Sequence, residues 1–76
     1  MLHLFVLKTC PYCGKVADFI KENSIDINIK DIEQGENFND LMKLGGKEQV
    51  PFLYDDIKEV AMYDSAEIIK YLEKNY

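Results

Sequence analysis

The sequence predicts one α/β domain over residues 1–76, with a four-stranded mixed sheet, helices on both faces and the element order βαβαββα. Three observations carry this prediction. An almost continuous apolar run, Leu2–Leu7, is typical of a central strand that is covered on both faces. Residues 26–30 alternate between polar and apolar side chains, which favours a second strand. Two further short apolar segments, residues 52–54 and 59–62, flank the turn-forming pair Asp55-Asp56.

The first half of the chain is expected to form a right-handed parallel βαβ crossover. A turn from Thr9 to Gly14 leads into a helix at roughly residues 13–23, whose inward face consists of Val16, Ala17 and Ile20. The strand at residues 26–30 should be half-exposed and lie at a sheet edge. Its predicted inward face consists of Ile25, Ile27 and Ile29.

After a polar loop at residues 33–36, the sequence predicts a short second helix. Asn37 is expected to cap this helix, and Gly45-Gly46 to end it. The predicted inward residues are Phe38, Leu41 and Met42. A hairpin then follows, with Phe52–Tyr54 and Glu59–Met62 as its strands.

The segment Asp64–Glu67 matches a capping box and predicts the start of the last helix. The apolar stripe of that helix consists of Ile68, Ile69 and Leu72. Tyr71, Tyr76 and the lone His3 are interpreted as structural side chains. The whole order is that of a thioredoxin fold in its minimal form.

Composition excludes several functional classes. A net charge of −5, from nine lysines, no arginine and 14 acidic residues, argues against nucleic acid as a partner. It also gives no reason to expect binding to anionic membranes. No apolar run approaches the ~18 residues of a membrane span, and the N-terminus lacks a signal-peptide pattern. We therefore expect a cytoplasmic protein with no nucleic-acid or membrane partner.

The pair Cys10 and Cys13 carries the most specific functional signal. A disulfide between residues three positions apart removes little chain entropy, so the spacing favours redox chemistry over a structural bridge. A Cys10 thiolate would face the free N–H groups and positive dipole end of the following helix, and Cys13 could act as the resolving thiol. A zinc site would need four ligands, and besides the two cysteines the chain offers only the distant His3, so no metal is expected.

Three other places are candidates for a binding site. Lys8 could add positive charge near the Cys10 sulfur, although a solvated lysine is an equally good interpretation. If the Val50-Pro51 bond is cis, it presents the Val50 backbone to a peptide-like substrate, and the upstream cysteine pair favours this over a trans turn proline. The helix start at Asp64 and Ser65 could hold a carboxylate and an ammonium group, besides being capped by Asp64.

With these residues assembled, the chain resembles a dithiol glutaredoxin over nearly its whole length. The resemblance is carried by the segment Lys8–Cys13, which reads Lys-Thr-Cys-Pro-Tyr-Cys, by Gly45-Gly46, by Val50-Pro51 and by Tyr63–Ser65. It implies a glutathione-dependent thiol–disulfide oxidoreductase that reduces glutathione-mixed disulfides and small or protein disulfides. Glutathione would be a co-substrate rather than a bound cofactor. The partners would be glutathionylated or disulfide-bonded proteins, and the chain would act as a monomer.

The resemblance also implies roles for individual residues. Cys10 would attack the mixed disulfide, and Cys13 would resolve protein disulfides. The glutathione-binding residues would be Lys8, Tyr12, Gln49, Val50, Pro51, Asp64 and Ser65. Among these, Tyr12 would form a wall of the groove beside the sulfur, and Lys8 would lie near the glycine carboxylate of glutathione.

Two places depart from the family pattern. Glu48 and Gln49 precede the Val-Pro pair where relatives commonly have a basic residue and threonine, and Ala61-Met62 replaces the usual glycine pair. Lys47 is a candidate substitute at the glycine end of glutathione. Two alternatives stay open on sequence alone: a redoxin reduced by thioredoxin reductase, and a dimer that holds an iron–sulfur cluster through Cys10 and glutathione.

Overall fold

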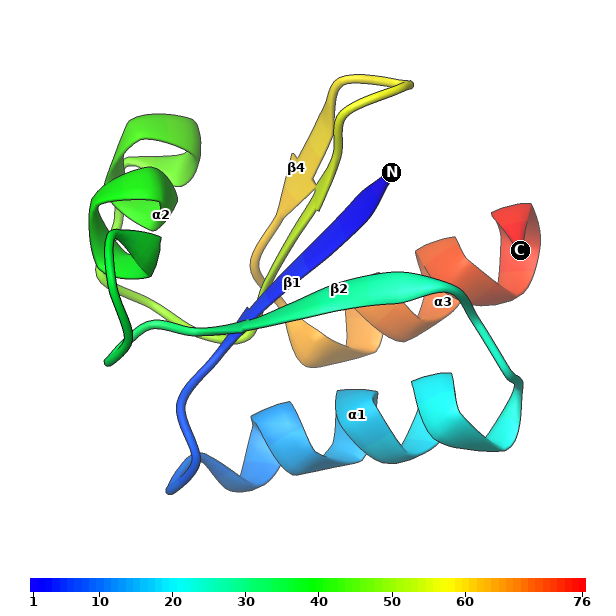
Figure 1. The fold of residues 1–76 in the computed structure, drawn as a ribbon. Coiled ribbons are helices and arrows are strands. Elements are labelled where there is room, and N and C mark those ends of the chain that lie inside the picture. Colours follow the sequence, from blue (N-terminus) through cyan, green and yellow to red (C-terminus); the bar gives the residue numbers. More distant parts are fainter.

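The structure, a computed structural model, describes residues 1–76 as a four-stranded sheet with helices on both faces (Figure 1). This confirms the predicted fold class and element order. None of the three helices is long and apolar enough to cross a membrane. The elements are β1 (Leu2–Val6), α1 (Pro11–Glu22), β2 (Ile27–Asp31), α2 (Asn37–Gly45), β3 (Phe52–Asp55), β4 (Val60–Met62) and α3 (Ser65–Asn75).

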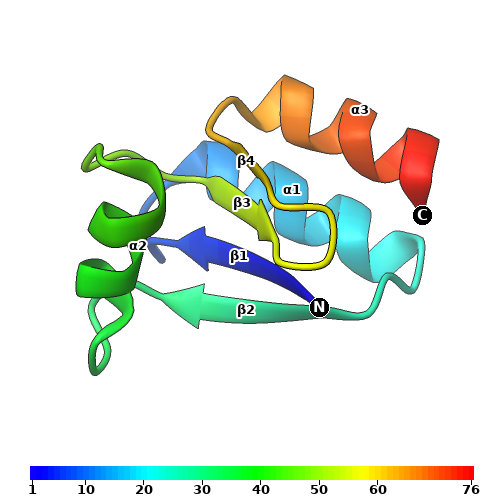
Figure 2. The same ribbon diagram turned by 90° about the horizontal axis from the view of Figure 1, so that it is seen from above.

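The strands lie in the order β2-β1-β3-β4. β1 runs parallel to β2, with Leu2 opposite Ile27, and antiparallel to β3, with Leu4 opposite Leu53. β4 then pairs antiparallel to β3. The apolar run at the N-terminus therefore forms a central strand, as predicted, and β2 lies at an edge. Figure 2 shows α1 and α3 side by side on one face of the sheet and α2 beside the other.

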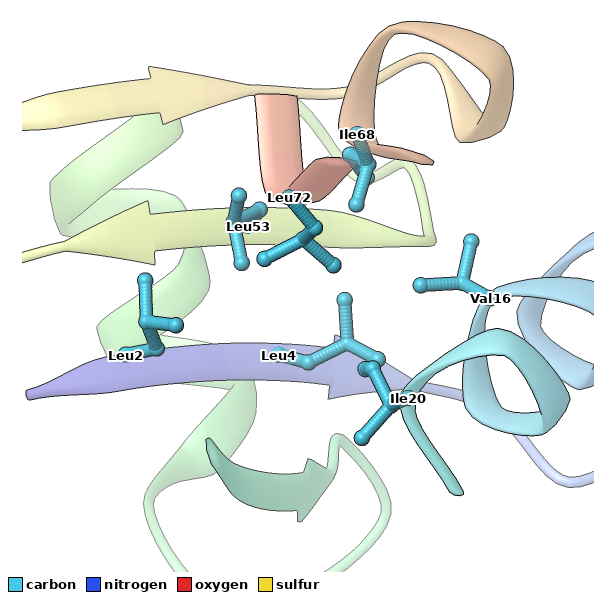
Figure 3. Close-up of a cluster of buried hydrophobic side chains, with 7 residues drawn as sticks. All are labelled: Leu2, Leu4, Val16, Ile20, Leu53, Ile68 and Leu72. Carbon is cyan, nitrogen blue, oxygen red and sulfur yellow. The ribbon is translucent and has the colours of Figure 1, made fainter. Parts of the chain in front are cut away.

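Alternation along β1 divides the core between the two faces of the sheet. Leu2 and Leu4 point toward α1 and α3, where they meet side chains from both helices and Leu53 of β3 (Figure 3). The seven residues of this main cluster are at most 5% exposed: Leu2, Leu4, Val16, Ile20, Leu53, Ile68 and Leu72. Burial of these apolar side chains makes the main favourable contribution to the stability of the fold, and it also holds α1 against the sheet.

The opposite face of the sheet is covered by α2 alone. Phe5, Leu41 and Phe52 form a second buried cluster there. Two details of the predicted helix are wrong. Met42 is exposed, because Leu41 takes the core-facing position. Asn37 does not cap α2, because its side-chain amide donates to the Asp31 carbonyl at 2.8 Å, which ties α2 to the end of β2 instead.

The edge strand β2 is less buried than the alternation of its isoleucines with polar residues suggests. Ile25 and Ile27 pack against the main cluster, whereas Ile29 is 49% exposed, so the prediction of an inward Ile29 is wrong. Ile29 instead lines a surface hollow together with Cys10 and Cys13. α1 also begins two residues earlier than expected, at Pro11, because a proline tolerates the first helical position.

The hairpin differs from its prediction at Asp55, which belongs to β3 and is fully buried rather than part of an exposed turn. Its carboxylate accepts hydrogen bonds from the hydroxyls of Tyr71 and Tyr76, both at 2.7 Å. It also accepts from the backbone N–H groups of Ile57 and Lys58. Tyr71 and Tyr76 are thus structural, as predicted, but through a polar network rather than through apolar packing alone.

Candidate active site

Cys10 and Cys13 lie where β1 ends and α1 begins. Cys10 is the N-cap residue of α1 and has an extended backbone conformation, and Pro11 occupies the first helical position. Cys13 lies in the first turn, where its side chain faces the core and is only 3% exposed. Both cysteines are free thiols. The same short segment therefore presents one accessible sulfur and one buried sulfur.

The two thiols have opposite acidities. Partial burial raises the pKa of Cys10, but hydrogen bonds from the Cys13 side chain and from the N–H groups of Cys13 and Tyr12 outweigh it and lower the pKa. Burial raises the pKa of Cys13 to about 11, helped by its hydrogen bond to Cys10 and by the charge of Cys10. Since the thiolate is the nucleophile in disulfide exchange, this asymmetry favours Cys10 as the attacking group. Hydrogen bonds, rather than the charge of Lys8, account for the shift at Cys10.

A groove of about 460 Å³ lies beside this segment, a volume in the range of small-molecule sites. It is assembled from the start of α1, the α2–β3 loop and the start of α3. The lining residues are Tyr12, Gln49, Val50, Pro51, Tyr63, Asp64 and Ser65. The structure thus brings together six of the seven residues that the resemblance assigns to glutathione binding.

Val50 connects the groove to the reactive sulfur. The Val50-Pro51 peptide bond is cis, and the Cys10 Sγ lies 3.9 Å from the Val50 carbonyl oxygen. Neither the N–H nor the carbonyl of Val50 makes a hydrogen bond with another backbone group of the chain. A peptide-like ligand in the groove could therefore pair with this backbone while its sulfur approaches Cys10.

The helix start at Asp64 forms the far end of the groove. The Asp64 carboxylate accepts a hydrogen bond from the Ala66 N–H at 3.1 Å, so its capping role is as predicted. The reciprocal half of the capping box is absent, because Glu67 lies 4.0 Å from Lys70 and makes no hydrogen bond to the Asp64 N–H. The first turn of a helix leaves further N–H groups free, and Asp64 and Ser65 at this helix start line the groove, so a carboxylate could bind here.

Lys8 lies outside the groove. It lines a separate, mainly apolar hollow of about 160 Å³, together with Leu7, Ile29 and both cysteines. Glu48 is exposed and does not line the groove. Its negative charge is therefore not part of the groove wall, where it would repel a bound carboxylate. Two other lysines lie over aromatic side chains of the groove: the Nζ atoms of Lys15 and Lys47 are 5.6 and 5.9 Å from the ring centroids of Tyr12 and Tyr63.

Tyr63 is the groove residue that the site assignment from sequence missed. Its ring lines the groove and packs on Phe52, with centroids 4.7 Å apart. An aromatic residue directly before the Asp64-Ser65 helix start was the available signal. No group of three or more His, Cys, Asp or Glu side chains in the structure could hold a metal ion.

Comparison with known proteins gives one family and several structural relatives. The family model that matches residues 4–76 describes the N-terminal domain of glutathione S-transferases. An uncharacterized glutaredoxin-like 8.6 kDa protein of the rubredoxin operon in Clostridium pasteurianum is 31% identical over 78 residues. That alignment covers 97% of this chain and 100% of the relative.

Two solved structures illustrate the shared fold. The thioredoxin-like protein BC3987 superposes with a TM-score of 0.81 at 19% identity, over 97% of both chains. Glutaredoxin 2 from Salmonella typhimurium, solved in complex with glutathione, gives a TM-score of 0.75 at 19% identity. In that case the match covers 95% of this chain and 32% of the longer protein. At these identities, the two structures establish the fold alone.

Proposed function

Because the chain belongs to the glutathione S-transferase N-terminal domain family and has a glutaredoxin-type thioredoxin fold, we propose that it is a glutathione-dependent thiol–disulfide oxidoreductase. In this proposal it reduces glutathione-mixed disulfides and small or protein disulfides. The observation that carries the proposal is the pair of thiols with opposite pKa shifts, whose accessible member, Cys10, lies next to the Val50 carbonyl of the groove. A transferase would instead stabilise the thiolate of glutathione itself as the nucleophile and would need no pair of thiols at this position.

The first half-reaction uses Cys10 alone. Its thiolate attacks the glutathionyl sulfur of a mixed disulfide, the substrate's sulfur–sulfur bond breaks, and the substrate leaves as a thiolate that takes up a proton. A new disulfide joins Cys10 to glutathione. A second glutathione thiolate then attacks the bound glutathionyl sulfur, which releases glutathione disulfide and restores the Cys10 thiolate. The net reaction converts one mixed disulfide and one glutathione into a free thiol and glutathione disulfide.

Reduction of a protein disulfide would also use Cys13. Once Cys10 is joined to the substrate by a disulfide, it carries no negative charge, and that charge is one of the factors that raise the pKa of Cys13. The Cys13 thiol then loses its proton more readily and attacks the Cys10 sulfur. The substrate leaves as a dithiol, and a Cys10–Cys13 disulfide remains for two glutathione molecules to reduce.

The groove supports glutathione as the co-substrate of this reaction. The backbone of Val50 pairs with no other backbone group of the chain and suits the cysteinyl peptide unit. The α3 start at Asp64 and Ser65 suits the γ-glutamyl carboxylate and ammonium. A similar fold binds glutathione in the Salmonella protein. The proposal includes action as a monomer in the cytoplasm, where the glutathione pool is reducing. Glutathionylated and disulfide-bonded proteins would be its partners.

The test is a coupled assay with a glutathionylated peptide, in which NADPH and glutathione reductase recycle glutathione. We expect Cys10→Ser to abolish turnover and Cys13→Ser to keep deglutathionylation while losing protein-disulfide reduction. Substantial turnover by the Cys10→Ser protein would refute the mechanism. Replacing the glutathione system by thioredoxin reductase in the same assay should give little turnover, and equal rates with both donors would refute glutathione dependence.

A further inference from the structure

The hydroxyl of Tyr63 is bonded twice to the backbone of a single residue. It accepts a hydrogen bond from the Lys47 N–H and donates one to the Lys47 carbonyl, each at 3.0 Å. A phenolic hydroxyl can donate and accept at once, so both bonds form together. The ring of Tyr63 is fixed in turn by Phe52, which is fully buried. Tyr63 thus ties the α2–β3 loop to the second core cluster.

Gly45 provides the space for this contact. Its backbone does not require glycine, because it lies in the last turn of α2 and has no positive φ, unlike Gly46 with its φ of +79°. A Cβ atom at Gly45, however, would collide with the Tyr63 hydroxyl and lie 2.7 Å from Cζ of that ring. At Gly46, a Cβ would meet nothing within 4 Å. The two neighbouring glycines therefore serve different purposes, and Gly45 allows Tyr63 to approach.

The loop that Tyr63 holds carries part of the groove. The Lys47 carbonyl accepts both the Tyr63 hydroxyl and the Gln49 N–H, the latter at 2.9 Å, so one oxygen fixes the turn that leads to Val50. Within residues 47–50, the bond from Gln49 to Lys47 is the sole hydrogen bond between backbone groups. Both Gln49 and Val50 line the groove, and Val50 also meets the Cys10 sulfur.

We propose that Tyr63 is a positioning residue whose hydroxyl latches residues 47–50, so that the Val50 backbone is held ready to pair with the glutathionyl group. The inference rests on the proposed glutathione-dependent function. A loop that is ordered before binding has no ordering entropy left to lose when the ligand arrives. Without the latch, the binding-competent loop conformation is populated less often, and the apparent affinity falls by the same factor.

The test compares wild type with Tyr63→Phe, which keeps the ring on Phe52 and in the groove but removes the hydroxyl. We expect the KM for a glutathionylated peptide to rise about three- to tenfold, the factor that a neutral hydrogen bond is typically worth, with kcat changed by less than about twofold. Amide hydrogen exchange of Lys47, followed by NMR, should accelerate by a similar factor because its N–H loses its acceptor.

Two further variants make the result specific. Tyr54→Phe is the matched control, since the Tyr54 hydroxyl makes no hydrogen bond within the chain and lies away from the groove, and it should leave both readouts unchanged. Gly45→Ala keeps the Tyr63 hydroxyl but displaces it from Lys47, and should raise the KM and the Lys47 exchange rate as Tyr63→Phe does. An unchanged Lys47 exchange rate and an unchanged KM in Tyr63→Phe would overturn the latch.

The exchange measurement needs no glutathione, so it separates the two proposals. If wild type does not turn over the glutathionylated peptide but Lys47 exchange accelerates in Tyr63→Phe, the proposed function fails and the structural latch stands, without its role in binding. If wild type is active and the KM of Tyr63→Phe equals that of wild type, the proposed function stands and the positioning role fails.

Discussion

Replacing Tyr71 by phenylalanine removes one of four hydrogen-bond donors from the buried carboxylate of Asp55. Tyr71 and Tyr76 both donate to Oδ2, and the N–H groups of Ile57 and Lys58 donate to Oδ1. A hydrogen bond to a charged group contributes about 1.5–3 kcal/mol, and we take about 2 kcal/mol for Tyr71 because its hydroxyl is partly buried. For a domain of this size, that corresponds to a decrease in Tm of about 8–16 °C at pH 7.

Tyr76→Phe is a graded comparison within the same network. Tyr76 is 55% exposed, so water can replace its hydroxyl more easily, and we expect a decrease in Tm of about half that of Tyr71→Phe. Tyr54→Phe removes a hydroxyl that makes no hydrogen bond in the chain and should leave Tm within about 2 °C of wild type. Thermal unfolding followed by circular dichroism measures all three variants.

The pH dependence gives the network a second test. Burial raises the pKa of Asp55, but the hydrogen bonds from Tyr71, Tyr76 and the two N–H groups outweigh it and hold the pKa at about 2, below its ordinary 3.8. A lowered pKa contributes stability that is present above the unfolded value and is lost as the pH falls through about 2. The Tm difference between wild type and Tyr71→Phe should therefore be large at pH 7 and shrink at pH 2. A Tyr71→Phe protein within about 2 °C of wild type at pH 7, or equally destabilised at both pH values, would refute this reasoning.

Three further predictions concern the thiols, the core and the groove. Iodoacetamide should alkylate Cys10 well before Cys13 at pH 7, and the alkylation rate of Cys10 plotted against pH should have its inflection below the ordinary thiol pKa of 9.0. Equal alkylation rates of the two cysteines in peptide mapping would count against the assigned acidities. Leu53→Ala should cost about 2–5 kcal/mol in denaturant unfolding, and a loss below 1 kcal/mol would show that Leu53 is not a core residue. Asp64→Asn should keep the helix cap and raise the KM for a glutathionylated peptide. Asp64→Ala should raise the KM as well and also lose about 1 kcal/mol of stability, because the cap is removed. A wild-type KM in Asp64→Asn would exclude a charge contact between Asp64 and the ligand.

Local patterns were sufficient to predict the fold, and the resemblance to glutaredoxins supplied most of the groove residues. The run Leu2–Leu7 is typical of a covered strand. The Cys10 turn, Val50-Pro51 and Asp64-Ser65 each have a local backbone requirement that the sequence displays. The predicted cis bond at Val50-Pro51 is present in the structure. These segments are far apart in the chain, and the strand order brings them to one end of the sheet.

Features that depend on long-range contacts could not be predicted. Asp55 follows three strand residues and precedes another aspartate, which is the pattern of an exposed turn, and only the return of α3 places Tyr71 and Tyr76 against it. Asn37 was expected to cap α2, but the end of β2 offers its side chain a carbonyl acceptor instead. Lys8 precedes Cys10 by two residues, yet it lines a separate hollow and not the groove.

The most direct test of the central claim is to identify the sulfur that accepts the glutathionyl group. The Cys13→Ser and Cys10→Ser proteins are incubated with glutathione disulfide, and their intact masses and peptide maps are measured. We predict that Cys13→Ser gains one glutathionyl group, on Cys10, because this thiol has the lowered pKa and lies at the groove. Cys10→Ser should gain none. An unmodified Cys13→Ser protein, or a Cys10→Ser protein that is glutathionylated on Cys13, would contradict the assignment of Cys10 as the nucleophile.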